Sequence, residues 1–273
     1  MDLGKTLILG AIAGVTILIG MPLGRMRRPA VSLKIFLNAV AVGILLFLVW
    51  DVLSHAWEPI DTALSALHDK TGGYGPVFGY GSLFTAGLAV GLLSLVAYDH
   101  YLGRAKKSGT GIASWSPARR LSLLIAVGIG LHNFAEGLAI GQSAASNEVA
   151  LATLLVVGFA LHNATEGFGI VAPLATDIDE SGEVRRPSWA FLLTMALIGG
   201  GPTFVGTAVG HSFTSEAVSV VFLTLAAGSI IYVICQLLGV AARAARGNLL
   251  AYGLLLGLIA GFATDAVVTA AGA

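Results

Sequence analysis

The sequence contains few charged residues and almost no cysteine. Only 11% of its 273 residues are Asp, Glu, Lys or Arg, whereas about 25% is usual in soluble domains. The net charge is zero, so nucleic acid is not an implied partner. A single cysteine, Cys235, excludes a framework of intramolecular disulfides. Because 56% of the residues are hydrophobic, the composition favours several membrane spans over a soluble core.

Eight long apolar segments account for this composition. Each is long enough to cross, as a helix, the roughly 30 Å hydrocarbon core of a bilayer. We expect spans at residues 4–24, 32–54, 77–98, 120–142, 149–172, 188–210, 216–239 and 248–271. Basic residues follow the first segment. This order is typical of a first membrane span, whereas in a cleaved signal peptide the basic residues precede the apolar stretch. No stretch is left for a soluble domain, so residues 1–273 are expected to form one all-α transmembrane domain in the cell membrane.

The basic residues fall almost entirely on alternate connections between these segments. Only Lys5 and Lys70 lie on the other side. The positive-inside rule therefore places both termini outside the cell. The connection at residues 55–75, which includes Glu58, then faces outward. We interpret it as a solvated loop, with a funnel for cations as the alternative.

A short motif occurs twice in the middle of the chain. Residues 131–142 read Leu-His-Asn-Phe-Ala-Glu-Gly-Leu-Ala-Ile-Gly-Gln, and residues 161–167 read Leu-His-Asn-Ala-Thr-Glu-Gly. On a helix the His and the Glu of each copy lie one turn apart along the axis and about 40° apart around it. An ionisable group inside an apolar span costs roughly 2.5–3.5 kcal/mol, so it indicates a functional site.

Imidazole, carboxylate and amide groups together suit a first-row divalent metal ion. Zinc is the expected ion, and cadmium, iron, cobalt and manganese also fit. Only a few polar residues near 146–148 separate the fourth and fifth spans, so these spans should form an antiparallel hairpin that brings both motifs to one depth. Alone, such a His or Asn is usually a packing or hydrogen-bonding residue, but the repetition favours a shared site. The candidate ligands are His132, Asn133, Glu136, His162, Asn163 and Glu166.

At residues 132–137 and 162–167 the chain resembles the ZIP (ZRT/IRT-like protein) family of divalent metal transporters. The resemblance implies eight spans with both termini outside and metal import toward the cytoplasm. It also implies an inverted repeat of spans 1–3 and 6–8 around the hairpin of spans 4 and 5, and often a homodimer. An elevator-like shift of the hairpin, together with spans 1 and 6, is the implied mechanism.

The sequence departs from the family pattern in three places. Many members have a proline before the motif glutamate, where this chain has Ala135 and Thr165, so helix kinks there are not carried over. Members with two metal ions often take another glutamate from the sixth span, but residues 198–203 contain no carboxylate. The connection at residues 99–118 contains only one histidine, His100, so it is not expected to collect metal.

Other polar residues within the spans leave several interpretations open. Asp51 and His55 share a helix face near the outer end of the second span, where they either form a mouth for cations or reach interfacial water. The same ambiguity applies to His211. For Gln236 we favour hydrogen bonding between helices, and Asp265 needs only an interfacial or interhelical partner.

The sixth span contains the segment Gly199-Gly200-Gly201-Pro202. We expect this segment to break or loosen the helix at mid-depth and to lie next to the metal, because interrupted helices line the substrate path of many transporters.

Two other functions remain open from the sequence. Paired Glu and His residues on bundle helices also form zinc or di-iron sites in enzymes, so an intramembrane metalloenzyme is one alternative. The chain shows neither a positioned acid or base nor a substrate groove for it. The other alternative is a proton-driven carrier of an organic solute, with His and Glu as relay residues.

Overall fold

The computed structural model describes residues 1–25, 31–105, 111–146, 149–179, 184–212, 215–242 and 247–270, and some side chains inside these ranges are outside the description. The described secondary structure is helical apart from one isolated β-bridge between Ile178 and Val184. The α-helices are α1 (Leu3–Val15), α2 (Val31–His68), α3 (Tyr74–Ala105), α4 (Pro117–Ala145), α5 (Val149–Val171), α6 (Trp189–Ser212), α7 (Glu216–Ala242) and α8 (Gly247–Ala270). The short 3-10 helices are η1 (Thr16–Ile19), η2 (Met21–Arg25), η4 (Gly111–Ser114) and η5 (Ala172–Thr176).

Seven of the described helical segments are long and apolar enough to cross a membrane. One of them, Leu3–Arg25, combines α1 with η1 and η2, and the others lie on α2, α3, α4, α6, α7 and α8. The remaining expected span coincides with α5, a helix of 23 residues. The prediction of an all-helical, polytopic membrane protein is confirmed.

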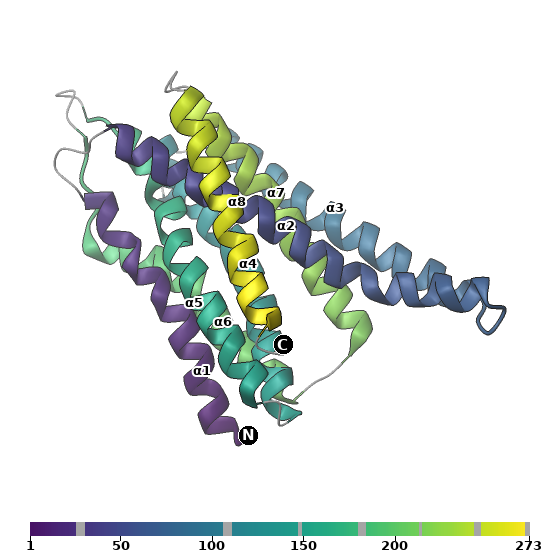
Figure 1. Ribbon diagram of the computed structural model, residues 1–273. Coiled ribbons are helices and arrows are strands. Elements are labelled where there is room, and N and C mark those ends of the chain that lie inside the picture. Colours follow the sequence, from purple (N-terminus) through teal and green to yellow (C-terminus); the bar gives the residue numbers. More distant parts are fainter. Residues whose placement is uncertain are drawn as a thin grey trace.

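The helices pack in two groups. In the first group α4 lies along α6, and α1 and α5 pack beside them; in the second, α2 lies along α8 and α3 along α7 (Figure 1). The two groups meet mainly where α4 contacts α7. Helices α2 and α3 form a hairpin whose tip projects beyond the other helices, and the start of α1 and the end of α8 lie toward the same end of the molecule (Figure 1).

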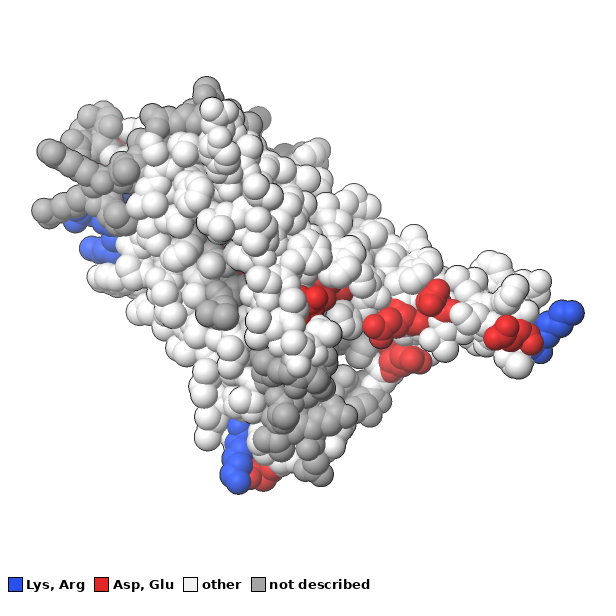
Figure 2. Space-filling view, viewed as in Figure 1, with Lys and Arg blue, Asp and Glu red and all other residues white. Residues whose placement is uncertain are grey.

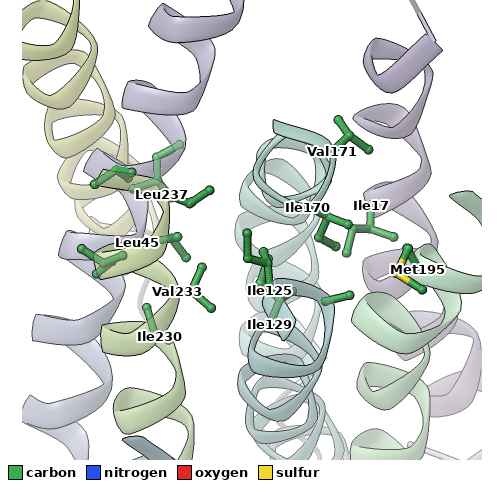
Figure 3. Close-up of a cluster of buried hydrophobic side chains, with 14 of the residues drawn as sticks. Ile17, Leu45, Ile125, Ile129, Ile170, Val171, Met195, Ile230, Val233 and Leu237 are labelled. Atoms are coloured by element: carbon green, nitrogen blue, oxygen red, sulfur yellow. The ribbon is translucent and has the colours of Figure 1, made fainter. Parts of the chain in front are cut away.

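Buried aliphatic side chains from both groups form the largest apolar cluster. Figure 3 shows Leu45, Val233 and Leu237 of the second group on one side of this cluster and Ile125 and Ile170 of the first group on the other. The exposed apolar side chains on the outer surfaces of the helices are those that a bilayer would solvate.

Helix α4, which carries the first motif, begins at a defined N-cap. The backbone N–H of Arg119 donates to the hydroxyl oxygen of Ser116 over 3.3 Å, and Pro117 occupies the first turn. Serine before the helix satisfies a free N–H group, and proline is tolerated there because it needs no donor. The helix then runs without interruption to Ala145.

The polar residues after position 54 are not a loop, so that prediction was wrong for residues 55–68. Helix α2 continues through Glu58 and Pro59 to His68. Residues 57, 58, 61 and 62 are exposed. Polar side chains at exposed positions can be solvated, so they do not end the helix. The connection between α2 and α3 therefore shrinks to a short turn that contains Lys70, whose φ is 58°.

The expected break in the sixth span is also absent from the described helix α6, which is continuous through Pro202. Proline removes the N–H that would bind the carbonyl of Ile198, four residues earlier. The backbone of α4 covers this carbonyl, because a Cβ atom added to Gly130 would collide with the Ile198 oxygen. Close packing of two helices therefore holds the segment in helical form.

Candidate metal-binding site

The first motif lies in the buried middle of α4. The side chains of His132 and Glu136 are only 2% and 4% exposed, and Nε2 of His132 lies 2.8 Å from Oε1 of Glu136. This distance is that of an ion pair between a protonated imidazole and a carboxylate. A buried ionisable pair persists because each partner compensates the other for lost water.

The second motif reaches the same place from α5. Oε1 of Glu166 lies 4.0 Å from Nε2 of His132. The other oxygen of Glu166, Oε2, accepts a hydrogen bond of 3.2 Å from Nδ2 of Asn133. Four of the six predicted residues, three from α4 and one from α5, are therefore brought together: His132, Asn133, Glu136 and Glu166.

The two remaining predicted residues lie on α5. Asn163 is fully buried, and its Nδ2 donates to the carbonyl of Ala13 over 3.1 Å. His162 belongs to the same helix, but its side chain lies outside the described residues. The amide oxygens of Asn133 and Asn163 accept no hydrogen bond from the described residues. A buried oxygen without a donor is costly, and a bound cation would remove that cost.

The described side chains are not already arranged around an ion. Among them, no three His, Cys, Asp or Glu residues are positioned to hold a metal. The candidate ligands instead contact one another, as His132 does with Glu136. An ion that uses Nε2 of this imidazole must therefore displace its contact with Glu136.

A cavity of about 810 Å³ leads to this cluster. His132 and Glu136 line it together with residues from α2, α7 and α8. Asp51 and His55 also line it, and Nδ1 of His55 lies 3.5 Å from Oδ1 of Asp51. Acidic side chains gather along the outer half of α2 and near the start of α7 (Figure 2). The acidic residues that line the cavity are Asp51, Glu58, Glu136, Glu216 and Asp265.

Sequence reasoning assigned no role to some of these lining residues. Glu216 is the first residue of α7, and no local pattern marks it as part of a site. Gln142 lies within the quoted first motif stretch, on the same helix as His132, and lines the cavity as well. Of the other residues considered, His211 lies in the last turn of α6 and Gln236 is half-buried on α7.

The fold and this cluster define a polytopic membrane protein with metal-ligand side chains buried between its helices. Residues 99–268 match the model of the ZIP zinc transporter family. The chain therefore belongs to this family, and it is a multi-pass integral protein of the cell membrane.

Individual bacterial relatives agree with this assignment. The chain is 34% identical over 146 residues to zinc transporter ZupT of Enterobacter sp. (strain 638), covering 52% of this chain and 51% of that protein. The identity and coverage are the same for zinc transporter ZupT of Escherichia coli (strain K12 / DH10B). The chain thus spans about half the length of the curated relatives it matches.

Proposed function

We propose that this protein transports zinc across the cell membrane toward the cytoplasm. The observation that carries the proposal is that His132 and Glu136 of one motif copy meet Glu166 of the other in a buried place between two helices. Nitrogen and carboxylate oxygen ligands are those that zinc uses in proteins. The relatives named as zinc transporters support this choice of ion.

The two motif copies would supply the ligands in the membrane. In this proposal His132, Glu136 and Glu166 are joined by His162 and by the oxygen atoms of the two motif asparagines. Glu136 and Glu166 are both at most 5% exposed. Two carboxylates would neutralise the charge of a divalent ion that has lost its hydration shell. Iron, manganese, cobalt and cadmium would compete for the same ligands, because affinity alone does not select among such ions.

The cavity would be the route from the outside to this site. Exposed Glu58 of α2 and Glu216 of α7 line it, and so does buried Glu136. Negative charge along a cleft raises the local concentration of cations. The chain would cross the membrane eight times with both termini outside, as one transporter domain. Helix α1 starts and helix α8 ends toward the same end of the molecule, which supports this topology (Figure 1).

Transport would occur by alternating access, with α1, α4, α5 and α6 shifting as one body against α2, α3, α7 and α8. The division of the helices into two packed groups supports this mechanism. At their contact, the hydroxyl of Ser229 on α7 lies 3.0 Å from the carbonyl oxygen of Gly128 on α4 and 2.7 Å from that of Ala226 on its own helix. Because Ala226 is an alternative acceptor, the Ser229 hydroxyl would keep a hydrogen-bond partner after a shift.

Uptake of radioactive zinc into proteoliposomes tests the proposed function. Glu136→Ala and His162→Ala should each abolish uptake, whereas Asp69→Asn, a change of an exposed acidic residue at the hairpin tip, should leave it unchanged. Each variant is first compared with the original protein by size-exclusion chromatography and thermal unfolding. Full uptake by both folded variants would contradict the proposal, and uptake of solute by metal-free protein would favour an organic substrate.

A further inference from the structure

Each motif asparagine is held by a backbone carbonyl from a different helix. Nδ2 of Asn133 donates to the carbonyl of Gly199 on α6 over 3.0 Å. Nδ2 of Asn163 donates to the carbonyl of Ala13 on α1 over 3.1 Å. Both asparagines are fully buried. The two motif copies are thus anchored in the same manner, one to α6 and the other to α1.

The two acceptor carbonyls lie at the crossing of α1 and α6. A Cβ atom added to Gly14 would collide with the carbonyl oxygen of Gly200, and one added to Gly200 would collide with that of Gly14. The helices therefore touch backbone to backbone at these two glycines, a contact that larger residues prevent. Ala13 and Gly199 directly precede them, so their carbonyl groups are fixed by the crossing.

Local helix structure makes these carbonyls available as acceptors. Helix α1 ends at Val15 and continues as 3-10 helix, so the regular α-helical bonding ends beside Ala13. The Ala13 oxygen also accepts a bond of 2.6 Å from the hydroxyl of Thr16. In α6, Pro202 removes the helical donor of the Ile198 carbonyl and not that of Gly199, so the Gly199 oxygen takes the bond from Asn133 as an additional one. A carbonyl oxygen has two lone pairs and accepts a second hydrogen bond readily.

These two hydrogen bonds fix the orientation of each asparagine amide group, and this orientation matters for the candidate metal-binding site. With the N–H side bound to a fixed carbonyl, the orientation of the amide plane is set and the oxygen must point elsewhere. Those oxygens are the ones without a described donor. Asn133 also donates to Glu166, so its position affects a carboxylate of the other motif copy. The crossing of α1 and α6 therefore bears on the placement of oxygen atoms from both copies.

We propose that Asn133 and Asn163 are positioning residues through which the contact of Gly14 with Gly200 sets the geometry of the ion site. This inference rests on the proposed function, because it assumes that the motif residues bind a metal ion. It assigns to α1 and α6 a part in ion binding, although neither Gly14 nor Gly200 has a side chain that could be a ligand. Disturbing the crossing should therefore change ion binding from a distance.

The test uses Co²⁺ as a spectroscopic probe in the purified protein. Gly200→Ala should weaken Co²⁺ and Zn²⁺ binding by about tenfold or more, the usual loss when groups that orient metal ligands are changed, and should alter the visible Co²⁺ absorption bands. Gly201→Ala is the matched control in the same helix, because a Cβ atom there meets only the flexible side chain of Leu197. It should preserve both affinity and spectrum.

Asn163→Asp provides a second variant in case Gly200→Ala does not fold. Aspartate keeps the oxygen ligands and adds charge, but it cannot donate to the carbonyl of Ala13. A positioning role therefore predicts weaker binding and a changed spectrum, whereas a role as ligand alone predicts equal or tighter binding.

The possible results separate this inference from the proposed function. Folded Gly200→Ala protein with unchanged affinity and spectrum would overturn the inference, as would an equal effect of Gly201→Ala or tighter, spectrally unchanged binding by Asn163→Asp. If the original protein does not bind Co²⁺, or if His132→Ala binds it with the original spectrum, the proposed function and this inference both fail.

Discussion

Nε2 of His132 on α4 and Oε1 of Glu166 on α5 lie 4.0 Å apart in the buried interior of the protein. Each residue belongs to a different copy of the repeated motif, so the two copies contribute to one cluster. A single ion held between them would neutralise two carboxylates and replace the contact of His132 with Glu136. Four predictions follow from this cluster and from the packing that surrounds it.

Zinc binding should release protons and should weaken in acid. The histidine and glutamate ligands must be deprotonated to bind a metal, so protons compete with zinc for the same atoms. We expect affinity at about pH 5.5 to be lower than at about pH 7.5, a range in which histidine changes its charge. Isothermal titration in two buffers with different ionisation enthalpies measures the proton release. Equal affinity at both pH values with no buffer dependence would contradict the prediction.

Removing negative charge from the cavity should impair zinc capture but not the maximal transport rate. Asp51 and Asp265 both line the cavity. The double variant Asp51→Asn and Asp265→Asn should raise the half-saturating zinc concentration about tenfold, the lower end of the range for electrostatic focusing. Uptake should also become less sensitive to ionic strength. The control is Asp69→Asn at the hairpin tip. If the double variant had the same half-saturating zinc concentration as this control, a role of the cavity charges in zinc capture would be excluded.

Because α4 and α6 pack closely, substitution of Gly206 on α6 should lower the stability of the protein. A Cβ atom on Gly206 would collide with the carbonyl oxygen of Phe134, whereas one on Gly79 meets no atom within 4 Å. Gly206→Ala should therefore destabilise the protein by about 1–3 kcal/mol, the cost of overpacking. Gly79→Ala should be neutral or stabilising by up to about 1 kcal/mol, because alanine favours helix. Thermal unfolding in detergent distinguishes them, and equal melting temperatures would refute the packing argument.

The buried carboxylate near the start of α4 should depend on its arginine partner. Nε of Arg119 lies 3.3 Å from Oδ2 of Asp177, whose side chain is only 4% exposed. Arg119→Met should destabilise the protein by roughly 3 kcal/mol, because it leaves a buried charge uncompensated. Adding Asp177→Asn should recover part of the loss, which a double-mutant cycle of unfolding free energies measures. Additive effects of the two changes would mean that the pair is not coupled, and exposed Arg186→Ala serves as control.

The sequence predicted the class of fold, and four of the six candidate ligands that it named lie together in the structure, for physical reasons that act locally. Long apolar runs indicate spans, and a His and a Glu at helical spacing share a face whatever the surroundings. The extent of α2 beyond residue 54 and the continuity of α6 through Pro202 were not predictable in this way. Water around the outer part of α2, and the backbone of α4 at Gly130, decide these outcomes from outside the segment concerned.

By itself the sequence determined that this protein is a membrane protein and that two motif copies carry the groups suited to a metal ion, because composition and helical spacing are properties of the chain alone. Only the tertiary structure decided that Glu166 lies beside His132, that the asparagines bind the carbonyls of Ala13 and Gly199, and that the cluster lies at the end of an acid-lined cavity. These contacts join residues far apart in the chain, and the close packing of whole helices creates them.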